Sequence, residues 1–71
     1  MTTYRIKITN LYGLHDSYCA YYRKLGDCFD FVNDVKYSSE LTGEEVEKIM
    51  NYRDWYLNQY KAEEMLIEEI V

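Results

Sequence analysis

Residues 42–61 constrain the fold most, because a start signal, a periodicity and a suitable length all predict one helix there. Thr42 stands three residues before Glu45, which is the spacing of a capping box that satisfies two backbone N–H groups at a helix start. Glu44, Glu45 and Glu47 place negative charge in the first turns, where the helix dipole favours it. We therefore expect one long helix over this segment.

This helix is predicted to have an apolar face and a polar flank. At about 100° per residue, the apolar face receives Val46, Ile49, Met50, Leu57 and Tyr60, with Tyr52 and Tyr56 along its edge. Trp55 projects roughly half a turn away, among the polar residues Glu44, Glu47, Asn51 and Asn58. The apolar face must be buried against another part of the chain.

Arg53 conflicts with this pattern, because it lies in the middle of the apolar face. An unpaired buried guanidinium is costly, so the side chain must either lay its stem along the core and reach water or meet a carboxylate. The expected partners are Asp27, Asp30 or Asp34, which precede the helix.

The first part of the chain shows the period-two alternation of half-buried strands. In residues 2–11, Tyr4, Ile6 and Ile8 alternate with Arg5, Lys7 and threonines. Residues 17–25 alternate in the same way and are rich in tyrosine, so we expect an antiparallel hairpin with the first strand. Because tyrosines stand on both faces of the second strand, they either wall a small core or leave one face exposed for binding.

Two later stretches each allow two interpretations. After a turn at Gly26-Asp27, residues 28–31 form either a third strand followed by a turn, which we favour, or part of a helix capped by Asp27. Residues 62–71 either continue the long helix or return as a terminal strand, and we favour the strand because a helix to Val71 is long for so small a domain. The sequence thus predicts one α+β domain over residues 1–71, with an antiparallel sheet of three to four strands packed against one long helix.

Charge is distributed unevenly along the chain, whose net charge is −5. Residues 1–41 carry five acidic and five basic residues, whereas residues 42–71 carry eight acidic and three basic ones. Such an acidic surface repels nucleic acid and membranes and attracts a basic partner. A chain of 71 residues also buries only a small core, so we expect homodimerisation as one route to stability.

Cys19 and Cys28 are expected to be reduced, mostly buried thiols, because no export signal precedes them. Together with His15, predicted on an exposed turn within residues 10–16, they supply three zinc ligands at wide spacing, whereas a structural zinc site takes four at closer spacing. We expect no metal and no cofactor. Since no apolar run has the length of a bilayer span, we expect the protein in the cytoplasm.

The order of the predicted elements and the segment Glu40-Leu41-Thr42-Gly43-Glu44-Glu45-Val46-Glu47-Lys48-Ile49 resemble small acidic proteins carried by bacteriophages. The pattern Leu-Thr-x-Glu-Glu-x-x-x-Ile carries most of this resemblance. The resemblance implies a host-takeover or counter-defence inhibitor, such as a DNA mimic, an anti-CRISPR protein or an anti-restriction protein. It transfers no functional residue, because such inhibitors share no sequence motif.

The leading hypothesis is a non-catalytic inhibitor that binds a basic, nucleic-acid-binding host protein. Glu44, Glu47 and Asp54 are the expected charged contacts and Trp55 the apolar anchor, with Asn51 and Asn58 beside it. The other interpretation of Trp55 is that it packs across a homodimer. The alternative is a structural phage protein that self-associates through its helix surface and terminal strand. An enzyme is not expected, because the chain has no catalytic Ser/His/Asp or Cys/His set that it can plausibly arrange and no glycine-rich phosphate loop.

Overall fold

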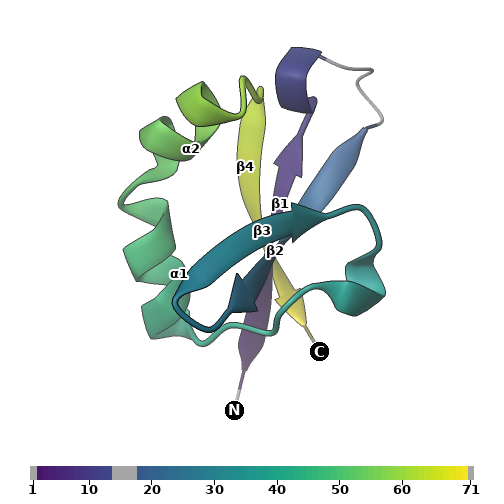
Figure 1. Ribbon diagram of the computed structural model, residues 1–71. Coiled ribbons are helices and arrows are strands. Elements are labelled where there is room, and N and C mark those ends of the chain that lie inside the picture. Colours follow the sequence, from purple (N-terminus) through teal and green to yellow (C-terminus); the bar gives the residue numbers. More distant parts are fainter. Residues whose placement is uncertain (1, 14–17, 71) are drawn as a thin grey trace.

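The computed structural model describes residues 2–13 and 18–70, which form one antiparallel sheet with two short helices against one of its faces (Figure 1). The order of strands across the sheet is β3-β2-β1-β4. The elements are β1 (Thr3–Thr9), η1 (Leu11–Gly13), β2 (Cys19–Leu25), β3 (Cys28–Val32), η2 (Val35–Tyr37), α1 (Gly43–Met50), α2 (Arg53–Gln59) and β4 (Glu64–Ile70), where η denotes a 3-10 turn. The predicted α+β class with an antiparallel sheet is confirmed.

The predicted hairpin at the start of the chain is confirmed in both its pairing and its faces. Lys7 pairs with Tyr21 and Thr9 with Cys19 in antiparallel register. Ile6 and Ile8 are fully buried under the helices, as the period-two pattern requires. His15 lies outside the residues that the structure describes, so its predicted position on a turn stays a prediction.

The two ambiguous stretches both follow the favoured interpretation. Residues 28–32 form β3, which pairs with β2, and a single 3-10 turn follows, capped by the Asp34 carboxylate, which accepts from the Lys36 N–H at 3.1 Å. The end of the chain is a strand. β4 pairs with β1 along its whole length, from Thr3 opposite Ile70 to Thr9 opposite Glu64.

The prediction of one long helix is wrong, because the helix breaks at Asn51 and Tyr52. The capping box that begins α1 is present: the Thr42 N–H donates to the Glu45 carboxylate at 3.0 Å, and the Glu45 N–H donates to Thr42 Oγ1 at 3.2 Å. The first helix then ends at Met50 with Asn51 as its C-cap, and Tyr52 leaves helical geometry with φ −108° and ψ 23° before α2 begins.

Because the helix breaks before Arg53, this residue does not lie on the buried face. A straight helix would have held this residue on the buried face, whereas after the break it is exposed and its only ion pair among the described residues is a loose one with Asp54, 3.9 Å away. The expected partners Asp27, Asp30 and Asp34 are therefore incorrect. Tyr52 and Tyr56 were both predicted at the edge of the apolar face. After the break between the helices, Tyr56 is buried and Tyr52 is exposed.

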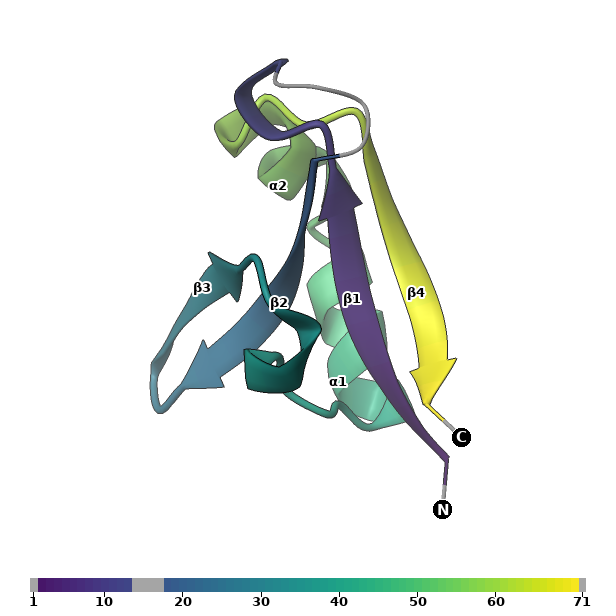
Figure 2. The same ribbon diagram turned by 90° about the vertical axis from the view of Figure 1, so that its right-hand side faces the viewer.

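The sheet is split, and a loop segment fills the gap. β1 and β2 are paired from Lys7–Tyr21 to Thr9–Cys19. Beyond the Lys7–Tyr21 pair the two strands separate, and residues 39–41 run between them (Figure 2). The Tyr4 N–H donates to the Leu41 carbonyl at 2.8 Å, the Leu41 N–H returns a bond to the Tyr4 carbonyl at 2.7 Å, and the Ser39 N–H donates to the Tyr22 carbonyl at 3.1 Å. Leu41 closes the gap from inside and has 0% exposure.

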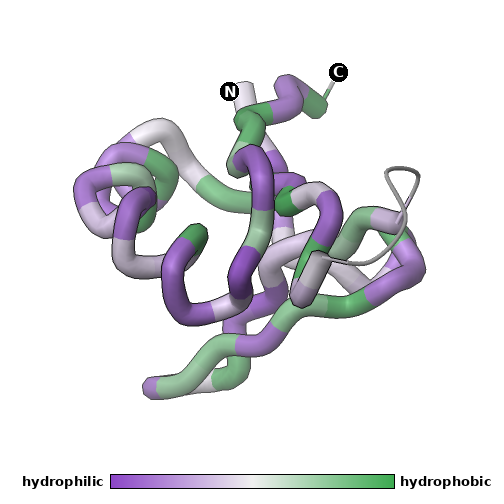
Figure 3. The backbone as a smooth tube through the Cα atoms, turned by 90° about the horizontal axis from the view of Figure 1, so that it is seen from above, coloured by the Kyte–Doolittle hydropathy of each residue, from purple (hydrophilic) through white to green (hydrophobic). Residues whose placement is uncertain are grey.

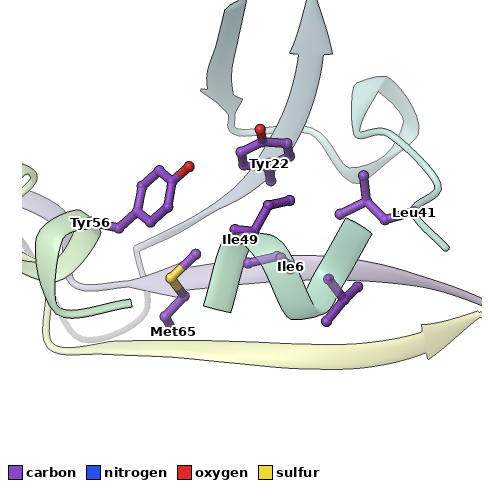
Figure 4. Packing of buried hydrophobic residues seen from close by; sticks show 7 residues of the cluster. Ile6, Tyr22, Leu41, Ile49, Tyr56 and Met65 are labelled. Atoms are coloured by element: carbon purple, nitrogen blue, oxygen red, sulfur yellow. The ribbon is translucent and has the colours of Figure 1, made fainter. Parts of the chain in front are cut away.

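The core is assembled from every layer of the fold rather than from one apolar segment. Hydrophobic and hydrophilic residues are interleaved along the chain (Figure 3). Side chains from the sheet, the helices and the gap-filling loop meet in one cluster (Figure 4), made of Ile6, Tyr22, Leu41, Val46, Ile49, Tyr56 and Met65. An aromatic layer extends this cluster toward β3 through Phe29 and Phe31, which stack edge-on against Tyr56.

Candidate functional site

The six residues expected to bind a partner all lie on the exposed side of the helical segment. The set, named the acidic helix flank below, consists of Glu44, Glu47, Asn51, Asp54, Trp55 and Asn58, and each is exposed. The break divides it, because the two glutamates belong to α1 and the last three residues to α2, with Asn51 between them. The flank is therefore a bent surface rather than one straight helix face.

The carboxylates of the flank are only weakly compensated. Glu44 stands 3.8 Å from the Lys48 ammonium and Asp54 3.9 Å from the Arg53 guanidinium, and all four side chains are well exposed. Exposed pairs of this kind contribute little and are screened by salt. Glu47 makes no ion pair with any residue that the structure describes. The negative charge of this surface is thus available to an incoming cation.

The Trp55 side chain is about half exposed, and its ring packs against other aromatic rings of the fold. The side chain is 51% exposed, and its ring packs edge-on against Tyr56 at a centroid distance of 5.0 Å and against Phe29 at 6.5 Å. Because these neighbours belong to the core and to β3, the indole is held in place before any partner arrives. An aromatic ring presented in this way loses little conformational entropy on binding.

Phe29 is the supporting residue that the sequence analysis did not connect with the site. It was assigned only to a possible strand, yet its ring also stacks on Tyr22 at 5.4 Å and so links Trp55 to the centre of the core. The alternation of Phe29 and Phe31 in a strand was the available signal, since it places both rings on the inner face. Which helix residue they meet depends on the packing of α2.

The open face of the sheet differs from the helix flank, because both of its arginines are paired with carboxylates. The Arg5 Nε donates to Glu68 at 2.8 Å, and the Arg23 Nε donates to Asp30 at 2.8 Å. The Arg23 guanidinium holds the pKa of the Asp30 carboxyl below its ordinary value. Tyr21 lies beneath the Arg5 guanidinium, 5.9 Å from the ring centroid. The strand register thus neutralises this face, whereas the helix flank stays anionic.

The acidic excess is not confined to the helix flank. Glu45 is turned away from it and is paired with Lys24, whose ammonium holds the pKa of the Glu45 carboxyl below its ordinary value, with help from the Thr42 N–H. The acidic tail forms β4 at one edge of the sheet, where Glu64, Glu68 and Glu69 belong to the strand. The negative charge of residues 42–71 is therefore shared between two separate surfaces.

The two cysteines are free, and the expectation that both are mostly buried is wrong for Cys28. This residue is exposed because it opens β3 directly after the hairpin turn and points to the uncovered face. Within residues 2–13 and 18–70 there is no cluster of three or more metal-ligating side chains and no pocket. None of the helices in this part of the chain is long and apolar enough to cross a membrane.

Comparison of the chain with protein-family models, with curated proteins and with solved structures found no match.

Proposed function

We propose that this chain is a non-catalytic phage inhibitor whose acidic helix flank binds the nucleic-acid-binding surface of a basic host protein. The observation that supports it is the exposed set of weakly compensated carboxylates beside a half-exposed Trp55 that packs edge-on against Tyr56. A partner of this kind is the target class of DNA mimics, anti-CRISPR proteins and anti-restriction proteins.

The proposed mechanism is electrostatic replacement of the phosphate backbone. A cleft that binds nucleic acid holds lysine and arginine side chains and a layer of small anions, which it releases when a polyanion binds. Glu44, Glu47 and Asp54 supply that negative charge, and long-range attraction speeds encounter with the basic surface. Trp55 adds apolar contact to the flank, because an exposed aromatic ring beside polar residues fits the pattern of interface hot spots.

Capture from a nuclease-treated bacterial lysate on the immobilised full chain tests the proposal. We expect a basic nucleic-acid-binding protein to be retained, to be released steeply as salt rises, and to be displaced by a short DNA duplex that competes for the same surface. Mass spectrometry then identifies it. The variant Glu44→Lys/Glu47→Lys/Asp54→Lys is expected to lose capture, and Trp55→Ala to weaken it about tenfold or more.

The matched control changes the net charge equally at sites away from the flank. Asp27→Lys/Glu40→Lys/Glu69→Lys reverses three exposed carboxylates on the hairpin turn, the loop and β4, and is expected to retain capture. Far-UV circular dichroism and thermal melting establish that both variants are folded. Retained capture by the flank variant, or a partner that duplex DNA does not displace, would rule out the proposed mode of binding.

A further inference from the structure

β4 is a long edge strand with one side unoccupied among the described residues. It is last in the strand order, so β1 covers one side of its backbone and nothing that is described covers the other (Figure 2). Two apolar side chains at its middle are substantially exposed, Leu66 at 41% and Ile67 at 48%. Such an edge offers a row of unpaired N–H and C=O groups to a further strand.

The sequence of β4 is complementary to itself when two copies run antiparallel. Full overlap of Glu64–Ile70 with a second copy places Ile67 on the two-fold axis, opposite its own equivalent. Glu64 then faces Ile70, Glu68 faces Leu66 and Glu69 faces Met65 of the second copy. Every glutamate opposes an apolar residue, although three of the seven strand residues are glutamates.

Neighbouring registers lack this property. Side chains that face each other in antiparallel strands lie on the same side of the sheet, so a two-fold axis must pass through a residue and not between two residues. The nearest alternative registers therefore have the axis at Leu66 or at Glu68. With the axis at Leu66, Glu64 faces Glu68, and with the axis at Glu68 that residue faces itself. Like charges directly opposite each other destabilise strand pairing. The charge pattern therefore selects the register that also pairs the whole strand.

The opposite edge of the sheet does not share this complementarity. The midpoint of β3 is Asp30, so full antiparallel overlap of Cys28–Val32 with a second copy places one carboxylate opposite another. A five-residue strand also offers fewer backbone groups than the seven of β4. The two free edges thus differ in a way that favours one of them.

We infer that β4 is a self-association edge, through which two copies of this chain pair antiparallel about Ile67 and join their sheets into one. The pairing supplies roughly six to eight backbone hydrogen bonds and brings the two exposed Ile67 side chains together. The two-fold axis is perpendicular to the sheet, so both pairs of helices lie on the same side and both acidic helix flanks remain free. The inference is independent of the proposed function.

Sedimentation equilibrium of the full chain over micromolar to millimolar concentration tests it. We expect a monomer–dimer equilibrium that added salt strengthens, because each copy carries a net charge of −5 and salt screens the repulsion. Capture of a basic partner has the opposite salt dependence, so the two proposals fail separately. Ile67→Glu and Ile67→Lys, each placing like charges on the axis, are expected to raise the dissociation constant of the dimer about tenfold or more.

Mixing the two variants tests the register itself. Only pairing about residue 67 places the new glutamate opposite the new lysine, so the mixture is expected to form a heterodimer more tightly than either variant forms a homodimer, as measured by native mass spectrometry. The matched control is Val35→Glu, which charges a similarly exposed apolar residue on η2, at 41% exposure, and is expected to leave the dimer unchanged.

Amide hydrogen exchange supplies a test on the unchanged protein. We expect protection of alternate β4 amides to rise with protein concentration, because pairing covers those that point away from β1. A chain that stays monomeric at millimolar concentration, β4 protection that is independent of concentration, or folded variants whose mixture forms no heterodimer would each overturn the inference.

Discussion

Replacing Leu41 by alanine tests whether the loop segment between β1 and β2 holds the split sheet together. The side chain has 0% exposure and packs in the main core cluster, while its backbone exchanges two hydrogen bonds with Tyr4. The substitution removes the side-chain packing and keeps the backbone bonds. The expected loss therefore reports on the filling of the gap rather than on the pairing of the loop.

The magnitude follows from burial and from the size of the chain. Truncating a fully buried leucine to alanine costs about 2–5 kcal/mol, because transfer free energy is lost and a cavity remains. At roughly 0.05–0.15 kcal/mol per residue, a domain of this length has a stability of only a few to about ten kcal/mol. In so small a domain each kcal/mol shifts Tm by about 4–8 °C, so we expect Leu41→Ala to lower Tm by roughly 10 °C or more.

Urea denaturation followed by far-UV circular dichroism measures the free energy of unfolding. Leu66→Ala is the matched control, since it makes the same chemical change at a residue that is 41% exposed on β4, and it is expected to cost under about 1 kcal/mol. Leu41→Met keeps most of the side-chain volume and is expected to cost less than about 1.5 kcal/mol. Equal losses for Leu41→Ala and Leu66→Ala would refute the role of Leu41 in closing the gap.

Thr42→Ala removes the side-chain half of the capping box and is expected to cost about 1 kcal/mol in urea denaturation, whereas Thr42→Ser, which keeps the hydroxyl, is expected to cost little. Burial, with a contribution from neighbouring Tyr22, raises the pKa of Tyr56 to about 12 from its ordinary 10.0. The unfolded chain therefore loses this proton at a lower pH than the folded chain does. The stability that the protonated Tyr56 side chain contributes to the folded state is complete below pH 10 and is lost as the pH rises from 10 toward 12. With Tyr56→Phe, we expect the midpoint of urea denaturation to fall less steeply between pH 10 and pH 12. A fall as steep as that of the unchanged protein would contradict this prediction.

Local patterns in the sequence determined the type and approximate position of most elements. The alternation around Ile6 and Ile8 depends on the geometry of a single strand, and the capping box at Thr42 on backbone groups a few residues apart. Such signals involve no distant residue. Helical periodicity likewise separated Trp55 and the flank carboxylates from the buried side chains within each helix, so the exposure of the candidate site was predictable.

Tertiary structure alone decided the features that join distant parts of the chain. The helix departs from helical geometry at Tyr52, and Arg53 is exposed after this break instead of lying on the buried face, where an unpaired guanidinium is costly. The burial of Leu41 depends on the separation of two strands far from it in sequence. Ion pairs such as Arg5–Glu68 follow from strand register, which side-chain burial and turns fix only when the whole sheet forms.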